Sequence, residues 1–229
     1  MKILRKVSPL VWMVICAGVL LLVLSNLQVW SNFSSEKVAS AYDPRTQNDE
    51  ALVATLVSSL WSTTDEVRTD AEKKMIAFAQ TSPTRRELVI NKLLSSVNAE
   101  KELDGTHTIL KTTFLYWKSV TDIFAELDAR EAVDILIRCV QCSNGYTGNM
   151  GEPPASYALV RMGKPILPTL SKALSQEPDA YKRMKIVLCI ARIGGSKAIS
   201  DLEQALRSES NKEVRNIIKF SLSKMKSSN

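Results

Sequence analysis

The stretch SQEPDAYKRMKIVLCIARI, residues 175–193, recurs in altered form as RSESNKEVRNIIKFSLSKM, residues 207–225. The two stretches align at an offset of 32 residues, which places Arg183 on Arg215. Self-similarity at a fixed period of about 20 to 50 residues is the signature of a repeat architecture. We therefore predict that this part of the chain consists of stacked copies of one structural unit.

Each copy has the apolar spacing of two helices, A and B, joined by a tight turn. Gly163 and Gly194 stand between the two helices, where a tight turn favours a residue that adopts positive φ. Apolar positions that recur between copies, such as Leu188 and Phe220, are expected to fill the seams between helices. One helix pair cannot bury its apolar face alone, whereas stacked pairs bury a continuous core. We predict an α-α solenoid of four or five such pairs over residues 50–229.

An earlier segment has the strongest helical stripe. Its apolar residues recur in steps of three and four: Leu110, Phe114, Trp117, Val120, Phe124 and Leu127. This spacing predicts one long helix with one buried face. Helix-start signals precede three further segments, at residues 62–65, at Ser82 with Pro83, and at Asn211.

The composition agrees with a folded, all-α domain. Hydrophobic residues make up 45% and charged residues 24% of the 229 residues, which is the balance of a globular chain. The chain has only eight glycines and eight prolines, whereas a β-sandwich or barrel needs many turn residues.

The repeats resemble the HEAT-repeat superfamily, especially the short HEAT-like repeats of bacterial proteins. The segments that carry the resemblance are DEVR at 65–68, KEVR at 212–215, ARIGGSKAISDLEQAL at 191–206 and VRMGKPILPTLSKAL at 160–174. The resemblance is good over residues 123–226 and looser over residues 50–122. It implies an α-α superhelical solenoid that serves as a binding scaffold. Some related proteins are lyases that attach bilin pigments, but no residue here supports carrying over that activity.

The N-terminal region predicts a membrane anchor. Residues 1–8 form a basic tail, residues 9–30 are mostly apolar, and residues 31–49 form a polar linker. At about 1.5 Å per residue the apolar segment spans about 33 Å, enough to cross a bilayer core. The positive-inside rule then predicts a cytoplasmic N-terminus and an extracytoplasmic solenoid. A cleaved signal sequence is the alternative, and it predicts a secreted or periplasmic protein.

Catalysis and metal binding are not expected from this sequence. The single histidine, His107, excludes a zinc site built on several histidines and has no nucleophile motif beside it. Cys139 and Cys142 form a C-x-x-C pair, but the repeat register puts Cys139 inside a B helix and Cys142 at its end, where the helix dipole opposes a thiolate. We expect no catalytic residue, no metal and no cofactor. In an exported domain a disulfide is expected among Cys139, Cys142 and Cys189, and the sequence does not choose the pairing.

Two features are candidate partner-binding surfaces. The first is the polar loop at 143–154, whose sizeable apolar residues are Tyr146 and Met150. The second is the basic C-terminal region, because residues 157–229 carry 14 Lys and Arg against 6 Asp and Glu. Its candidate residues are Lys182, Arg183, Lys185, Arg215 and Lys219. An anionic membrane surface or an acidic protein fits this charge, and nucleic acid is not expected outside the cytoplasm. Arg68 and Arg215 are also expected to bond neighbouring helix ends or acids.

These observations predict a non-catalytic, membrane-tethered adaptor that binds a protein partner through the concave face formed by the B helices. An enzyme or enzyme accessory subunit of the HEAT-like lyase type is one alternative. A secreted periplasmic binding protein without an anchor is another.

Overall fold

The computed structural model describes residues 44–100, 103, 109–143 and 153–227. Residues Glu50–Asn229 form one compact unit. The described residues contain ten α-helices and two short 3-10 helices, and no strand is found in these ranges. The predicted all-α class is therefore confirmed for the part of the chain that the structure describes.

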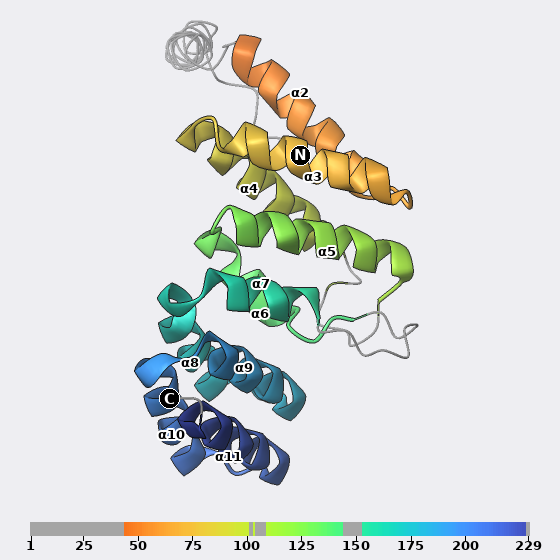
Figure 1. The fold of residues 1–229 in the computed structure, drawn as a ribbon. Helices are drawn as coiled ribbons and strands as arrows, with labels where there is room; N and C mark the ends of the chain where they lie inside the picture. Colours follow the sequence, from red (N-terminus) through yellow and green to blue (C-terminus); the bar gives the residue numbers. More distant parts are fainter. Residues whose placement is uncertain (1–43, 101–102, 104–108, 144–152, 228–229) are drawn as a thin grey trace, which may run out of the picture. The chain divides into compact units, whose positions relative to one another are not determined.

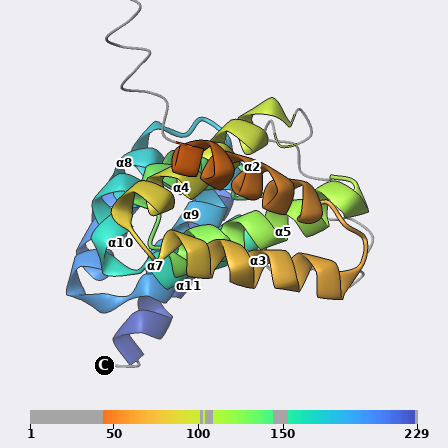
Figure 2. The ribbon, with the colours of Figure 1, turned by 90° about the horizontal axis from the view of Figure 1, so that it is seen from above.

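The helices follow one another as A and B members of successive pairs (Figure 1). Their bounds are α2 Pro44–Ser59, α3 Asp65–Ala79, α4 Pro83–Ala99, α5 Lys111–Glu126, α6 Val133–Arg138, α7 Pro154–Met162, α8 Leu167–Gln176, α9 Ala180–Ile193, α10 Gly195–Ser208 and α11 Lys212–Ser227. The A helices α3, α5, α7, α9 and α11 each pack on the next one in chain order, and α6, α8 and α10 form the B layer behind them. Figure 2 shows the same arrangement from above, with α8 and α10 together on one side.

The predicted helix starts coincide with real N-termini. The side chain of Ser82 accepts a hydrogen bond from the Arg85 amide at 3.2 Å, and Asn211 accepts one from the Val214 amide at 3.1 Å. Each satisfies an amide that has no partner within its helix. Helix α3 begins at Asp65 as predicted, although its N-cap residue makes no side-chain capping bond. Helix α2 begins at Pro44, inside the predicted linker, because proline favours the first turn of a helix.

The A-to-B joints depend on glycine. Gly163 ends α7 with φ 71° and ψ −151°, and Gly194 ends α9 with φ 73° and ψ −171°. Side-chain-bearing residues avoid this region of backbone space because their Cβ clashes with the flanking peptide groups. The predicted turns are thus confirmed, with the same backbone conformation in two successive repeats.

Replacing Gly194 by alanine is expected to lower the free energy of unfolding by about 2 kcal/mol, because the alanine must adopt this strained conformation. Space is not the obstacle, since an added Cβ would lie 4.0 Å from its nearest neighbour, the Ala191 carbonyl oxygen. Chemical denaturation of the variant checks the value. Ser196→Ala, at an exposed position two residues later in α10, is the matched control and should change the free energy by less than about 0.5 kcal/mol.

The core runs through the whole unit and includes several large aromatic side chains of α5. Trp117, Val120 and Phe124 of the predicted stripe are fully buried. Leu110 departs from the prediction, because it is 57% exposed. The helix begins only at Lys111, so Leu110 occupies the N-cap with an extended backbone and its side chain leaves the stripe.

One repeated pair of apolar residues also lies outside the core. Leu188 and Phe220 were expected in the seams, yet they are 38% and 58% exposed. The neighbours of Leu188 in α9, Val187 and Cys189, face the core instead. Successive helix residues lie about 100° apart, so a face formed by the buried Ile186, Val187, Cys189 and Ile190 leaves Leu188 on the opposite side of α9.

The part of the chain that the structure describes contains no helix with the length and apolar character that a membrane span requires. The predicted anchor, residues 9–30, lies outside the described residues.

Candidate partner-binding site

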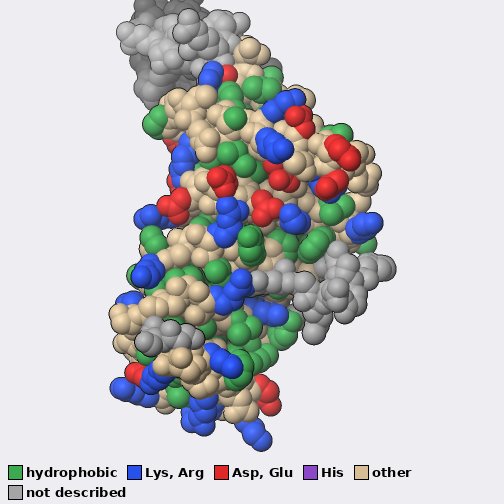
Figure 3. Space-filling model, in the orientation of Figure 1, with side chains coloured by type: hydrophobic (Ala, Val, Ile, Leu, Met, Phe, Trp, Pro, Cys, Tyr) green, Lys and Arg blue, Asp and Glu red, His purple; other side chains and the backbone are tan. Residues whose placement is uncertain are grey.

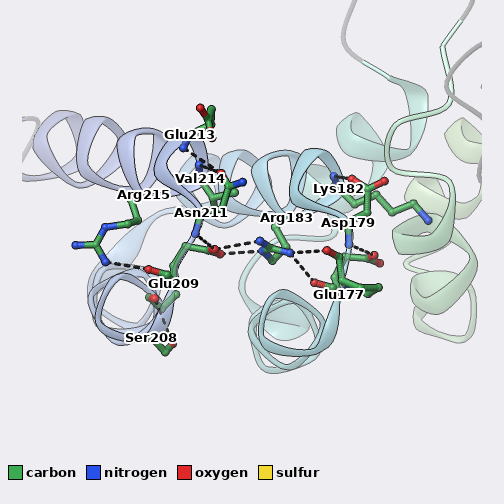
Figure 4. Close-up of polar contacts among 12 residues, drawn as sticks. Glu177, Asp179, Lys182, Arg183, Ser208, Glu209, Asn211, Glu213, Val214 and Arg215 are labelled. Carbon is green, nitrogen blue, oxygen red and sulfur yellow. Dashed lines mark hydrogen bonds and ion pairs between the residues drawn. The ribbon is translucent and has the colours of Figure 1, made fainter.

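Arg183 joins two successive repeats. Its Nε and Nη2 donate to the two carboxylate oxygens of Glu209 at 2.8 and 3.0 Å, in a bidentate pair (Figure 4). Its Nη1 donates to the carbonyl oxygens of Glu177 and Pro178 at 3.0 and 2.8 Å. The Glu209 side chain is only 8% exposed, and the hydrogen bond from Arg183 lowers the pKa of its carboxyl group. The pair therefore ties α9 to the segment that leads into α11.

The same arginine position recurs in three repeats. Arg68 donates to the carbonyl of Ser62 at 2.7 Å, Arg183 to that of Glu177, and Arg215 to that of Glu209 at 2.9 Å. In each case the carbonyl lies six residues before the arginine. The guanidinium thus fixes the chain reversal that enters each A helix. The prediction that Arg68 and Arg215 bond neighbouring helix ends or acids is confirmed, because Arg215 also bonds the Leu206 carbonyl in α10 and Arg68 also pairs with the Asp65 carboxylate.

The five basic candidates all lie on α9 and α11, but they differ in access. Arg183 and Arg215 are half-buried and bonded to the backbone, so their roles in the structure are architectural. Lys182 and Lys185 are half-buried on α9, where the Lys185 ammonium lies 5.0 Å from the centre of the Tyr181 ring. Lys219 is exposed on α11. A role in partner binding stays a prediction for all five.

The loop candidates, Tyr146 and Met150, lie outside the described residues, as does His107. Partner binding by this loop therefore also stays a prediction.

An open groove of about 660 Å³ lies between the B helices α8 and α10. Its most buried polar side chain is Asp201, whose Oδ2 accepts a hydrogen bond from the Ser171 hydroxyl at 2.6 Å and whose Oδ1 pairs with Lys197. These contacts hold the floor of the groove across two helices. The Arg183–Glu209 pair forms part of its wall.

The preceding repeat carries a neighbouring hollow. A second hollow of about 400 Å³ lies between α6 and α8 and shares Pro168 and Lys172 with the first. Asp134 and Ile137 line its other side. The B layer thus offers two adjacent hollows over three repeats, which we call the B-helix recess, with the exposed Lys172 between them.

Sequence reasoning missed Asp201. Its signal was an acid between Ile199 and Leu202, inside an apolar helical pattern, with Lys197 one turn earlier. A carboxylate at such a position is held by partners on a neighbouring helix.

The three cysteines that the structure describes are buried in the core and carry free thiols. Cys139 caps α6 instead of lying inside it, because α6 ends at Arg138, and its thiol donates to the Leu103 carbonyl at 2.9 Å. Cys142 and Cys189 are also buried. All three are thiols in the structure, so a disulfide stays a prediction that an intact mass under non-reducing conditions tests.

Burial raises the pKa of the Cys189 thiol to about 11. Because the thiolate is the reactive form, alkylation of Cys189 at pH 8 should be about 100-fold slower in the folded chain than in denaturant. Peptide-resolved mass spectrometry after timed iodoacetamide labelling measures the two rates. Equal rates would show that α9 opens readily and would contradict the burial. The raised pKa also means that the stability linked to this thiol is present below pH 9 and is lost as the pH rises toward 11.

The C-terminal helix pairs match a known family. Residues 155–223 match the family model for HEAT repeats. The match covers α7 to α11, which include both the Arg183–Glu209 pair and the groove. HEAT repeats are typically non-catalytic and mediate protein interactions. No curated protein matches the chain.

The described residues hold no group of three or more His, Cys, Asp or Glu side chains placed to bind a metal ion.

Proposed function

We propose that the protein is a non-catalytic scaffold that binds a segment of a partner protein in the recess of the B helices α6, α8 and α10. The observation that carries the proposal is the adjacency of the two hollows, which lie on either side of Pro168 and Lys172 of α8. HEAT repeats in residues 155–223 support a role in protein interaction.

The recess has the chemistry of a peptide site more than that of an active site. Asp201 and Glu209 are each neutralised by a basic neighbour, and they hold the scaffold together. Lys172 and Gln204 are exposed at the recess and are available to donate hydrogen bonds to a partner. Ile137 and Ala173 supply an apolar surface. Apolar surface flanked by polar groups is the usual anatomy of an interface.

A photo-crosslinking amino acid placed at Lys172 or at Gln204 of the full chain tests this proposal. Irradiation of native membranes should give one discrete adduct of the same mass increment from both positions. The same amino acid at the exposed Lys73 of α3 is the matched control and should give none. Absence of the adduct at the recess, or an equal adduct at Lys73, would count against the proposal. A bound chromophore on the purified chain would support the lyase-type alternative instead.

We also propose that residues 9–30 anchor the protein in a membrane, with the N-terminus in the cytoplasm and the repeats outside it. The apolar length of this segment and the basic residues before it support the arrangement. A cysteine introduced at Ser35 should react with a thiol reagent that does not cross membranes. Protection of that cysteine in intact cells would reverse the proposed orientation, and recovery of a shortened chain in the soluble fraction would indicate signal cleavage.

A further inference from the structure

The A helices α7, α9 and α11 carry a regular row of exposed apolar side chains. Tyr157 and Leu188 each stand six residues before the glycine that ends their helix, Gly163 and Gly194. Phe220 occupies the position of Leu188 in the next repeat, at the offset of 32 residues. The three side chains are 47%, 38% and 58% exposed. Isolated exposed apolar residues are ordinary on protein surfaces, so the informative feature is their recurrence at corresponding positions of three successive repeats.

A cation accompanies every apolar side chain of the row. Arg161, Arg192 and Lys224 each lie four residues later in the same helix, which places them on the same face one turn on. The Arg161 guanidinium lies 5.9 Å from the centre of the Tyr157 ring, and the Lys224 ammonium lies 5.7 Å from that of Phe220. We call these six residues the A-face ladder. Figure 3 shows hydrophobic and basic side chains next to each other over these helices.

The charge around the ladder is strongly positive. Helices α7, α9 and α11 together contain ten Lys and Arg and one acid, Glu213. The preceding A helix, α5, has balanced charge, with two lysines and two acids, and one of these acids, Glu126, pairs with Arg161 at 2.6 Å. The ladder therefore begins at α7, and a positive field of this kind attracts an acidic partner.

We propose that the A-face ladder binds an acidic amphipathic helix that lies across α7, α9 and α11. Neighbouring packed helices are about 8 to 10 Å apart, and a helix advances about 10.5 Å in seven residues. A partner helix with an apolar residue at every seventh position would therefore place one apolar side chain on each step of the ladder. An extended strand repeats on one face every 6.8 Å or so and does not match this spacing. Acidic residues flanking the apolar ones would meet Arg161, Arg192 and Lys224.

This surface is distinct from the B-helix recess, because it belongs to the other helix layer. An anionic lipid surface would also be attracted by the positive charge of the ladder. It has no regular spacing of apolar groups, however, that would match the regular steps of the ladder. Periodicity thus favours the helix.

The test uses a fluorescent designed peptide of about three heptads, with leucine at every seventh position and glutamate beside each leucine. It is titrated into the full chain in nanodiscs of phosphatidylcholine. We expect saturable binding with one peptide per chain, weakened by salt. Phe220→Asp, Leu188→Asp and Arg192→Glu should each weaken binding about tenfold or more. Val67→Asp on α3, which changes an equally exposed apolar residue (43%), should leave binding unchanged. Circular dichroism of each variant verifies that the helices are retained.

Three results would overturn the proposal. The first is absence of binding, and the second is equal binding of a peptide with the same composition but leucines at every fifth position. The third is an effect of Val67→Asp as large as that of Phe220→Asp. Nanodiscs that contain phosphatidylglycerol distinguish a partner helix from an anionic lipid surface. If the peptide no longer binds there, and α9 and α11 are protected from hydrogen exchange, the ladder binds the membrane surface. The recess crosslinks at Lys172 report on the other surface and are unaffected by any of these results.

Discussion

Replacing Trp117 by alanine is expected to lower the free energy of unfolding by about 3 to 5 kcal/mol, the loss that follows removal of a large aromatic side chain from a packed core. Trp117 of α5 is fully buried and is among the largest buried side chains of the described residues. The truncation removes many packing contacts at once and leaves a cavity that flanking helices fill only in part. Equilibrium denaturation in urea, followed by circular dichroism at the helix band, measures the loss.

Trp117→Phe is the informative companion to this variant. The indole Nε1 of Trp117 has no hydrogen-bond acceptor among the described residues, so it carries a desolvation cost that phenylalanine does not have. We expect Trp117→Phe to change the free energy by less than about 1.5 kcal/mol, because the lost volume and the removed N–H act in opposite directions. A loss as large as that of the alanine variant would contradict the expected gain from removing an unpaired N–H.

Replacing Arg183 by methionine is expected to lower the free energy of unfolding by about 3 kcal/mol. The change leaves the Glu209 carboxylate without its counter-ion and two carbonyl oxygens without a donor. This value is at the low end of the loss expected for a broken buried ion pair, because Glu209 and Arg183 line an open groove that water reaches. Arg207→Met, at an exposed position on α10, is the matched control and should cost less than about 0.5 kcal/mol.

The pH dependence provides an independent check on the pair. The pKa of Glu209 is lowered by Arg183, so the stabilisation is present above the ordinary carboxyl pKa of 4.5 and is lost as the pH falls through the lower folded-state pKa. The difference between wild type and Arg183→Met should therefore shrink below pH 4.5. A double-mutant cycle with Glu209→Gln isolates the coupling, and a coupling energy near zero would contradict the bidentate geometry.

The sequence alone was sufficient to predict the repeat architecture of the C-terminal half. The offset that places Arg183 on Arg215 corresponds in space to two arginines with the same backbone acceptor, six residues earlier in each repeat. Glycine at the A-to-B joints and Asn211 before α11 also predicted their local structure correctly. Each stands at a position where few residue types meet the physical requirement, a positive φ or an N-cap acceptor.

Tertiary contacts determined what the sequence did not reveal. Leu188 and Phe220 are apolar and recur at the repeat period, yet they face outward, since periodicity identifies equivalent positions without saying which are buried. Asp201 has no local signature as a groove residue, because its partner Ser171 lies 30 residues away on another helix. Leu110 belongs to the apolar stripe by spacing alone, and the helix starts one residue too late to include it.

The Arg183–Glu209 pair has a consequence for how the stack opens. In a linear array each repeat is stabilised by its own fold and by its contacts with nearest neighbours, so strong links between repeats decide how many of them unfold together. The Arg183 guanidinium bonds the segments that lead into two successive A helices, α9 and α11. Unfolding that starts at α11 therefore either stops before this pair or breaks it and extends to α9. The two helices should accordingly form a single cooperative unit, a foldon, and Arg183→Met should divide it into two that exchange their amide hydrogens separately.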